Sequence, residues 1–516
     1  MLQDVVIAGA GPNGLMLACE LRLAGLRPIV LERLPERSTE PRANGLVGQV
    51  VRMLDRRGLY ERLAGEDGPP EPVAGFVFGA LPLQLDVLDD NPLYLLGVPQ
   101  VRIEEVLQER ALELGVEIRR GHELVGLSQT ADAVTAQIAG PEGEYEVQAR
   151  YFVGADGGRS LTRKLVGIDF PGVIQDRMVS RTASVAVPEG WVDPATLALT
   201  VPGFGVIPPF RHLRTERGLF VFAPFPGRAP AMSTGEWDSP ADGPVTLAEV
   251  QESAERVLGA SLPLSPPEVD GPHILRRIAG GNSRLAERFR EGRVLLVGDA
   301  AHVHSAIGGP GLNLGLQDAI NLGWKLAGEI QGWAPEGLLD SYEAERRPVG
   351  KRVVMHTQAQ AALIAPGSEV TALRELFTEL LGYPRNVQHL ADLMSGADIR
   401  YFDGAHPLVG RWAPDLVLDR GDGPVRLASV TRAGRAVLLD FSGDSFFAGE
   451  ALSDRVEIVA ASTDTPGAPL AMLLRPDGYV AWAADSTGDA EREGLRAAAG
   501  RWFGVPAQRP LTSATR

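Results

Sequence analysis

Short apolar runs that end beside glycine or an acidic residue recur along the chain. The first run, residues 4–8, is rich in β-branched side chains, which is typical of a buried parallel strand. Three later runs have the same character, at 28–31, 151–154 and 294–297. Helical spacing of Leu, Ala and Met separates the first two runs at 15–24. Strands alternating with helices predict an α/β fold class.

The turn after the first strand has the pattern GxGxxG. Glycines there let the backbone approach a pyrophosphate, and the following helix offers free N–H groups. A lone GxGxxG is weak, but here strand, turn, helix, second strand and terminal Glu32 follow in register. We therefore predict a dinucleotide site. Its candidate residues are Gly9, Gly11, Pro12, Gly14, Glu32 and Arg33.

Two further turns place an aspartate beside glycine at a strand end. Asp156 lies in GADGGRS at 154–160, and Asp299 lies in GDAAH at 298–302. A carboxylate in this position can accept hydrogen bonds from a sugar hydroxyl, although either turn alone is equally consistent with an ordinary strand end. Residues 308–313, GGPGLN, precede a predicted long helix at 314–330 whose N-terminus would face an anion.

Composition excludes several classes of function. The chain has 516 residues with a net charge of −16, and its basic residues are dispersed, so a nucleic-acid partner is not expected. Cys19 is the only cysteine, which excludes an internal disulfide and a CxxC redox or zinc site; we expect no metal. Without a signal sequence or a long apolar span, we expect a cytoplasmic protein with no membrane partner.

These motifs together resemble those of the single-component, class A FAD-dependent aromatic hydroxylases. The resemblance rests on 9–14, 154–160 and 298–311 and covers nearly the whole chain. Within the family the chain is most similar to actinobacterial hydroxylases of aromatic polyketides, angucyclinone hydroxylases in particular, and to rifampicin monooxygenases. The resemblance implies α+β architecture overall: a Rossmann-like FAD-binding domain, an inserted mixed β-sheet substrate domain and a thioredoxin-like C-terminal domain.

The resemblance also implies roles for particular residues. Glu32 would bind the adenosine ribose, Arg42 and Gln100 the ribityl–pyrophosphate region, and Asp299 the ribityl or pyrophosphate segment. The start of the long helix would stabilise negative charge on the reduced flavin. The remaining cofactor candidates are Asp156, Pro310, Gly311, Leu312 and Asn313.

The chemistry implied by the family is carried by the flavin, so no catalytic side chain is assigned. FAD would be bound non-covalently and reduced by NADPH or NADH acting as a transient co-substrate. O₂ would add at flavin C4a, and the hydroperoxide would hydroxylate a polycyclic aromatic small molecule. Alternatives on the same scaffold are a Baeyer–Villiger or antibiotic-inactivating oxygenase, an FAD reductase or dehydrogenase, and a flavoprotein that binds an aromatic drug with little turnover.

We expect four segments. Residues 1–175 would begin the FAD-binding domain, 176–275 would form the substrate sheet, 276–400 would complete the FAD-binding domain, and 401–516 would form the C-terminal domain. The last segment has no cysteine and so cannot exchange thiols; it would serve packing or the formation of a homodimer.

Four phenylalanines in the predicted substrate segment have two interpretations. They either line an apolar site for a flat aromatic substrate or fill an ordinary core, and the second is favoured for any single one. They are Phe204, Phe210, Phe220 and Phe222. The chain also departs from its family at 304–306, where His304 precedes Ser305 and Ala306 rather than two prolines, and at Pro310, where a glutamine is common.

Overall fold

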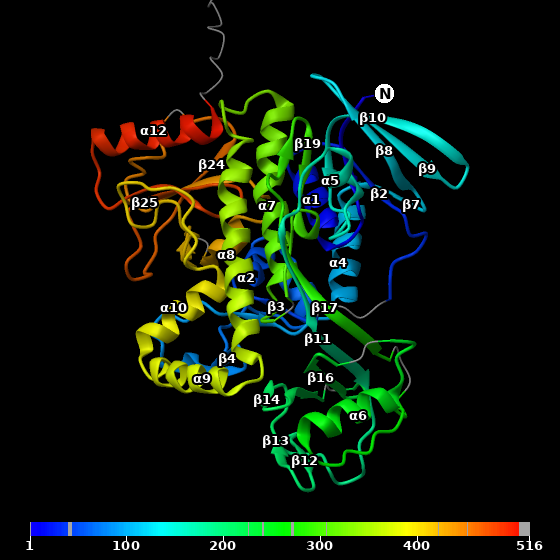
Figure 1. Ribbon diagram of the computed structural model, residues 1–516. Helices are drawn as coiled ribbons and strands as arrows, with labels where there is room; N and C mark the ends of the chain where they lie inside the picture. The colour runs from blue at the N-terminus through cyan, green and yellow to red at the C-terminus, as the bar shows by residue number, and fades with distance from the viewer. Residues whose placement is uncertain are drawn as a thin grey trace, which may run out of the picture.

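The computed structural model describes residues 2–504 except 40–43, 225–226, 240–241, 270–272, 306, 422 and 451. Arg42 and Ala306 therefore lie outside the described residues. Figure 1 shows three regions: a parallel-sheet domain at the upper right, a middle domain below it and a C-terminal domain at the upper left, with the long helices α7 and α8 between them. The α/β fold class is confirmed.

The parallel-sheet domain is built on a sheet with the order β18-β19-β10-β1-β2-β7, extended by the antiparallel pair β8 and β9. Strands β19, β10, β1, β2 and β7 run parallel to one another, and their apolar residues are buried on both faces. The strand bounds are β1 (Gln3–Ala8), β2 (Pro28–Glu32), β7 (Glu117–Arg120), β8 (Glu123–Gln129), β9 (Val134–Gly140), β10 (Gly143–Gly154), β18 (Arg290–Glu291) and β19 (Val294–Leu296).

Helices α1, α4 and α7 cover one face of this sheet. The crossing of α1 and α7 is close because Gly323 lacks a side chain: a Cβ there would lie 2.5 Å from Glu20 Cβ. Helix α7 begins at Pro310, four residues before the predicted start, because proline at the first helical position has a preset φ and needs no N–H partner. The helix bounds are α1 (Pro12–Leu23), α2 (Gln49–Asp55), α3 (Tyr60–Ala64), α4 (Gln100–Glu113), α5 (Leu161–Leu165) and α7 (Pro310–Gln331).

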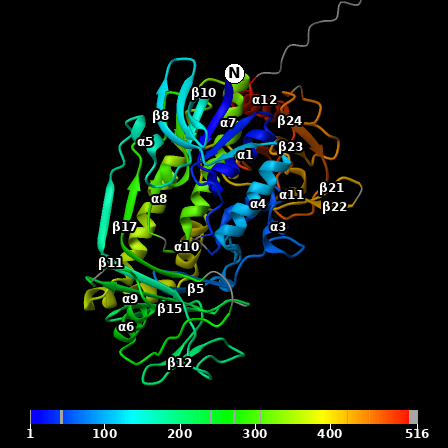
Figure 2. The same cartoon turned by 90° about the vertical axis from the view of Figure 1, so that its right-hand side faces the viewer.

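The middle domain is a six-stranded sheet with the order β14-β15-β16-β11-β17-β20. Helix α6 (Leu247–Leu258), capped by Thr246, covers one of its faces. The long strands β11 and β17 pair side by side and run from the parallel-sheet domain into the middle domain (Figures 1 and 2). The strand bounds are β11 (Gly172–Ser184), β12 (Leu199–Val201), β13 (Gly205–Ile207), β14 (Leu213–Thr215), β15 (Gly218–Ala223), β16 (Ala231–Trp237), β17 (Leu275–Leu285) and β20 (His302–Val303).

The phenylalanines of the middle domain belong to its core. Phe220 and Phe222 lie on the α6 side of β15 and are fully buried, and Phe204 packs against the same cluster. Phe210 is 46% exposed and has a φ of 60°. The core interpretation therefore describes Phe204, Phe220 and Phe222, because alternation along β15 turns both of its phenylalanines toward α6.

Helices α8–α10 and two short strand pairs surround the junction of these two domains. Helix α8 crosses α7, and α9 and α10 pack beside the hairpin of β4 and β5. Their bounds are α8 (Ser341–Ile364), α9 (Ser368–Leu381), α10 (Pro384–Ser395), β3 (Leu46–Val47), β4 (Gly75–Phe78), β5 (Leu81–Gln84) and β6 (Leu95–Leu96).

The C-terminal domain has the strand order β24-β23-β25-β26, in which only β23 and β24 are parallel, together with helix α12; this is a thioredoxin-like arrangement. Its aromatic residues Trp502 and Phe503 pack against Trp324 of α7. The domain therefore packs on the helix layer, as predicted, while a homodimer stays a prediction. The bounds are β21 (Val417–Asp419), β22 (Pro424–Arg426), α11 (Leu427–Val430), β23 (Ala436–Asp440), β24 (Val456–Ala460), β25 (Ala471–Leu474), β26 (Val480–Ala484) and α12 (Asp489–Phe503).

Candidate FAD site

A pocket of about 350 Å³ opens at the carboxyl ends of β1 and β2. It is lined by the glycine-rich turn, by Glu32 and Arg33, and by Asp156. A Cβ at Gly11 would meet no atom within 4 Å, so the turn presents bare backbone to open space there. No side chain caps the N-terminus of α1, which leaves its N–H groups directed at the same region. This cradle fits a pyrophosphate.

The other two glycines of the turn serve close packing. A Cβ at Gly9 would lie 2.3 Å from the carbonyl oxygen of Ala155, and one at Gly14 would lie 2.0 Å from the carbonyl oxygen of Gly9. Gly9 also has a φ of 110°, which side chains disfavour. The first and third glycines thus bring α1 against the neighbouring turn, while Gly11 leaves room for a ligand.

The carboxylate of Glu32 lies at the end of β2 and reaches back to the glycine-rich turn. Its Oε2 accepts a hydrogen bond from Ala10 N at 2.9 Å, and its Oε1 accepts one from Leu34 N at 3.0 Å. These bonds fix the carboxylate at the rim of the pocket, where lone pairs remain for a ribose hydroxyl.

Asp156 lines the pocket, but its carboxylate accepts hydrogen bonds from residues a few positions along the chain. Its Oδ1 accepts from Ser160 Oγ at 2.5 Å, and its Oδ2 accepts from both the N–H and the hydroxyl of Thr162 at 2.9 Å. Ser160 in turn accepts from Arg163 N and caps α5. The carboxylate therefore holds the turn and the start of α5 together.

Asp299 lies in the short helical turn η2 (Gly298–Ala300), and its side chain is exposed. Gly298 has a φ of 60°, and a Cβ there would meet the Asn13 amide of α1 at 2.0 Å. The loop at 298–303, hereafter the Asp299 loop, is thus pressed against the start of α1. This contact brings Asp299 to the same end of the sheet as the glycine-rich turn.

The N-terminus of α7 follows two glycines in the left-handed region, Gly308 and Gly309. Asn313 uses its side chain internally: Oδ1 accepts from Val47 N at 3.0 Å and Nδ2 donates to Gly309 O at 2.7 Å. No side chain caps this helix, so its backbone N–H groups, from Gly311 onward, remain for an anionic ligand edge. Pro310 is buried, and Gly311 and Leu312 are partly exposed.

Gln100, implied by resemblance to contact the cofactor, is the first residue of α4. Its Nε2 donates to Glu104 Oε1 at 2.8 Å, and Glu104 lines the glycine-rich pocket. Gln100 therefore lies one turn of α4 away from a residue that lines this pocket, and its contact with the cofactor stays a prediction.

A second cavity, of about 40 Å³, lies between the start of α7, α8 and α10, and His356 lines it. His304 lies beside the start of α7: a Cβ at Gly311 would be 3.4 Å from its ring. Burial lowers the pKa of His304 to about 4, and burial together with His304 lowers the pKa of His356 to about 4. Both rings are neutral at neutral pH, so the charges that line this cavity come from Arg352 and Asp398.

Sequence reasoning missed Asp318 and Arg346, which support the Asp299 loop from behind. Both side chains are fully buried and lie 2.7 Å apart, Arg346 Nε to Asp318 Oδ1. The available signal was a polar stripe at helical spacing, Asp318, Asn321 and Lys325, inside an otherwise apolar helix. Polar residues at such positions require partners in the core.

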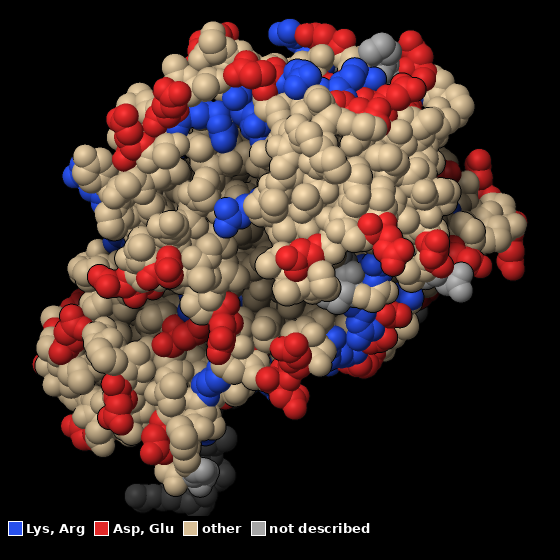
Figure 3. Space-filling model, turned by 90° about the horizontal axis from the view of Figure 1, so that it is seen from below, with Lys and Arg blue, Asp and Glu red and all other residues tan. Residues whose placement is uncertain are grey.

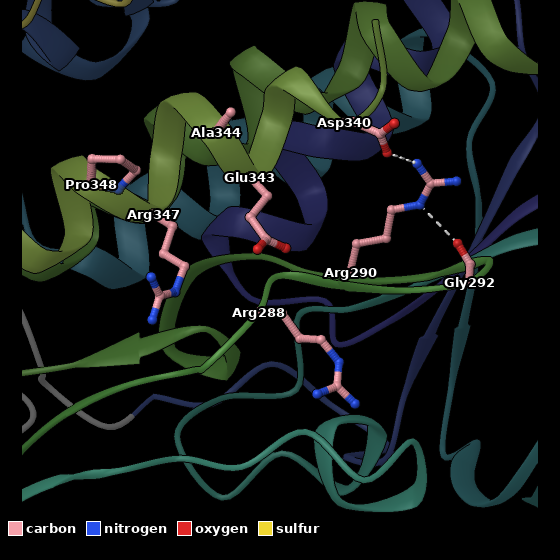
Figure 4. A pocket seen from close by; sticks show the side chains of 8 residues that line it. All are labelled: Arg288, Arg290, Gly292, Asp340, Glu343, Ala344, Arg347 and Pro348. Atoms are coloured by element: carbon pink, nitrogen blue, oxygen red, sulfur yellow. Dashed lines mark hydrogen bonds and ion pairs between the residues drawn. The ribbon is translucent and has the colours of Figure 1, made fainter. Parts of the chain in front are cut away.

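The largest of these cavities, about 630 Å³, lies elsewhere, between the β18 region and the start of α8 (Figure 4). Arg290 donates to Asp340 and to the carbonyl of Gly292, and Arg288 pairs with Glu291. Arg347 uses its Nε for the carbonyl of Ala286. Charges of both signs therefore meet in this pocket, and it lacks the bare backbone that the glycine-rich pocket presents.

The described residues contain no group of His, Cys, Asp and Glu arranged to hold a metal. None of the described helices is long and apolar enough to cross a membrane. The face seen from below mixes acidic and basic residues around a broad uncharged area (Figure 3).

Comparison with known proteins agrees with this geometry. The family described as FAD binding domain matches residues 3–357, and the family described as aromatic-ring hydroxylase, C-terminal, matches residues 406–506. The chain belongs to the FAD-dependent aromatic-ring hydroxylases. It is an FAD-dependent monooxygenase of this family.

Relatives and solved structures cover nearly the whole chain. A 12-dehydrotetracycline 5-monooxygenase/anhydrotetracycline 6-monooxygenase of Streptomyces rimosus is 45% identical over 98% of this chain and 100% of its own. A rifampicin monooxygenase of Streptomyces venezuelae is 40% identical over 97% and 99%. An aromatic hydroxylase from angucycline biosynthesis, named CabE, superimposes with a TM-score of 0.84 at 38% identity over 98% and 100%. Their names give 12-dehydrotetracycline, anhydrotetracycline and rifampicin as the substrates of the first two and angucycline biosynthesis as the pathway of the third.

Proposed function

We propose that the enzyme uses NADPH or NADH and O₂ to hydroxylate a polycyclic aromatic molecule of the polyketide or antibiotic type. The observation that carries the proposal is the place of β20. This strand, His302–Val303, is part of the Asp299 loop and also the edge strand of the middle-domain sheet, paired with Arg284 and Leu285 of β17. The loop beside the cofactor cradle and the sheet of the substrate domain are therefore one hydrogen-bonded unit.

Bound FAD would supply the electron transfer and oxygen activation, and the chain would supply binding and orientation. Gly11 and the α1 N-terminus would hold the pyrophosphate, Glu32 the adenosine ribose and Asp299 the ribityl or pyrophosphate segment. The N–H groups at the start of α7 would face the flavin ring and stabilise negative charge there. We assign Asp156 a supporting role, because its carboxylate is already used to hold α5.

The substrate would lie against the face of the middle-domain sheet that α6 leaves uncovered. Alternation along β15, β11 and β16 puts Val221, Thr182 and Ser233 on that face, all partly exposed. Thr182 and Ser233 share a hydrogen bond of 2.7 Å. A small apolar and hydroxyl-bearing surface of this kind suits a flat aromatic ring that carries oxygen substituents.

Isotope labelling tests the reaction. Purified enzyme with FAD, NAD(P)H and a panel of polycyclic aromatics is incubated under ¹⁸O₂, and the products are analysed by mass spectrometry. One ¹⁸O atom per product on an aromatic carbon supports hydroxylation. An ¹⁸O atom inserted into a ring as a lactone assigns a Baeyer–Villiger oxygenation instead, and oxidised product without ¹⁸O assigns a dehydrogenase. Tight binding of an aromatic without NAD(P)H oxidation would assign a sequestering flavoprotein.

Acid precipitation tests the mode of cofactor binding. The cradle holds a pyrophosphate through backbone N–H groups, so all flavin should appear as FAD in the supernatant. Flavin that stays in the pellet, or FMN in the supernatant, would contradict non-covalent FAD.

Stopped-flow reduction tests whether substrate controls the flavin. Gly308 and Gly309 both have positive φ and lie beside the expected ring position, where the loop needs conformational freedom. We expect an authentic substrate to accelerate NAD(P)H oxidation by about tenfold or more, equivalent to about 1.4 kcal/mol of barrier. Equal reduction rates with and without every aromatic tested would contradict this control.

A further inference from the structure

The carboxylate of Asp318 ties both ends of the Asp299 loop to helix α7. Its Oδ2 accepts a hydrogen bond from Gly298 N at 3.2 Å and lies 2.6 Å from His302 Nε2. One buried oxygen therefore contacts the residue directly before Asp299 and the residue three positions after it. Asp299 itself is exposed.

Arg346 of α8 connects this carboxylate to the start of α7. Its Nε donates to Asp318 Oδ1 at 2.7 Å, and its Nη2 donates to the carbonyl of Leu314 at 3.1 Å. Its Nη1 donates to the hydroxyl of Tyr401 at 2.8 Å. The same ion pair thus holds the Asp299 loop and the N-terminal part of α7, the segments proposed to contact the ribityl or pyrophosphate segment and the flavin ring.

Burial disfavours the charged form of Asp318 and of Arg346, and each charge is stabilised by the other. Burial alone would raise the pKa of Asp318, but Arg346 and His302 hold it below its ordinary value. Burial would lower the pKa of Arg346, but its neighbours, Asp318 among them, raise it. Both groups are charged, and replacing either one leaves the other charge buried without its partner.

The loop has little freedom to take another position while the pair is intact. Gly298 is confined between Asp318 and the amide of Asn13, which a Cβ would meet at 2.0 Å. The main-chain position of Asp299 relative to the glycine-rich turn is therefore set from inside the core.

We propose that Asp318 is a positioning residue for the cofactor: through Gly298 N–H and His302 it places Asp299 against the site where FAD binds. The inference rests on the proposed placement of FAD. In this arrangement Asp318 does not contact FAD. It affects the affinity for FAD by fixing the position of the Asp299 loop.

The test measures the dissociation constant of FAD from apoprotein by flavin fluorescence quenching. Asp318→Asn should raise that constant by about tenfold or more, since the loop loses an ionic anchor. The matched control is Glu345→Gln. Glu345 is also a buried carboxylate between α8 and α7, 2.7 Å from Lys325 Nζ and from Arg475 Nη1, but it does not contact the Asp299 loop.

Both variants should lose thermal stability, because each leaves buried cations underpaired. Only Asp318→Asn should weaken FAD binding, and Glu345→Gln should stay within twofold of the wild type. A second variant, His302→Leu, removes the contact between His302 and Asp318 and keeps the one from Gly298 N; it carries the test if Asp318→Asn does not fold, with an expected rise of about threefold.

The outcomes separate the inference from the function on which it rests. Wild-type apoprotein that binds no FAD would overturn the proposed placement. Wild-type binding with an unchanged constant in Asp318→Asn and His302→Leu, or an equal loss in Glu345→Gln, would overturn only the positioning role.

Discussion

The turns that carry Asp156 and Asp299 look alike in sequence and differ in what surrounds the carboxylate. Each follows a buried parallel strand, and each has glycine next to or near the aspartate. Asp156 receives three hydrogen bonds from Ser160 and Thr162, whereas Asp299 extends to the surface from a loop that is anchored behind it by Asp318. The difference lies in the residues that follow: a hydroxyl-rich helix start occupies the first carboxylate locally.

The two carboxylates therefore have different expected roles: Asp156 supports the fold, and Asp299 binds the cofactor. A carboxylate whose lone pairs are taken by its own helix start stabilises the fold and shapes the pocket wall. An exposed carboxylate on a loop that a buried carboxylate anchors can reach a ligand at the surface. Loss of the first should mainly lower stability, and loss of the second should mainly lower cofactor affinity.

The largest effect should come from Asp299→Ala. The variant removes a charged acceptor from FAD, at an expected cost of about 1.5–3 kcal/mol of binding free energy, or roughly 10- to 150-fold in the dissociation constant. FAD titration of the apoprotein measures this change. The melting temperature of the apoprotein should fall less than in Asp156→Ala, because the Asp299 side chain is exposed. Unchanged FAD affinity would remove the distinction between the two turns.

Asp156→Ala should show the opposite balance. It removes the acceptor of three hydrogen bonds at the start of α5, so we expect a loss of about 1–2 kcal/mol of apoprotein stability. Chemical denaturation of the apoprotein measures the loss, and FAD affinity measured under native conditions should fall by less than that of Asp299→Ala. A larger effect on FAD than on stability would make Asp156 a direct ligand.

Much of this organisation was predictable from sequence because its determinants are local. Strand, glycine-rich turn and helix occur within about 30 residues, so the dinucleotide unit and its Glu32 could be predicted from spacing. The thioredoxin-like arrangement followed from resemblance.

What could not be predicted depends on partners distant in the chain. Asp318 and Arg346 are 28 residues apart, and Arg346 and Tyr401 are 55 apart, so no local pattern marks their contact. Alternation in β15 grouped Phe220 with Phe222 but did not say which face α6 would cover. The short cap at Asp156 was visible as Ser160 and Thr162, yet the same residues were equally consistent with a cofactor turn.

Lowering the pH should reduce stability through the region of the Asp299 loop and not through the Asp156 turn. His304 directly follows the Asp299 loop, and no histidine lies in 154–160. Burial lowers the pKa of His304 from its ordinary 6.5 to about 4 in the folded protein. Between these values the unfolded state binds more protons, so stability falls as pH decreases. From pH 7.5 to 5.5 the loss should be about 1.3 kcal/mol for this residue.

The measurement compares wild type with His304→Asn by chemical denaturation at both pH values. The variant should lose less stability on acidification. Equal pH dependence in wild type and His304→Asn would show that folding does not lower the pKa of this histidine.

The smallest effect should come from Ser160→Ala, which removes the N-cap of α5 and leaves every charged group in place. Ser160 Oγ donates to Asp156 and accepts from Arg163 N, and the side chain is fully buried. Loss of an N-cap of this kind costs about 1 kcal/mol of stability. Asp156 keeps its two bonds from Thr162, so the carboxylate should stay in place and FAD affinity should remain within twofold of the wild type. Denaturation and FAD titration of Ser160→Ala measure both quantities. If FAD affinity falls tenfold while stability is unchanged, the hydroxyl serves the cofactor, and the two aspartate turns are alike in function as well as in sequence.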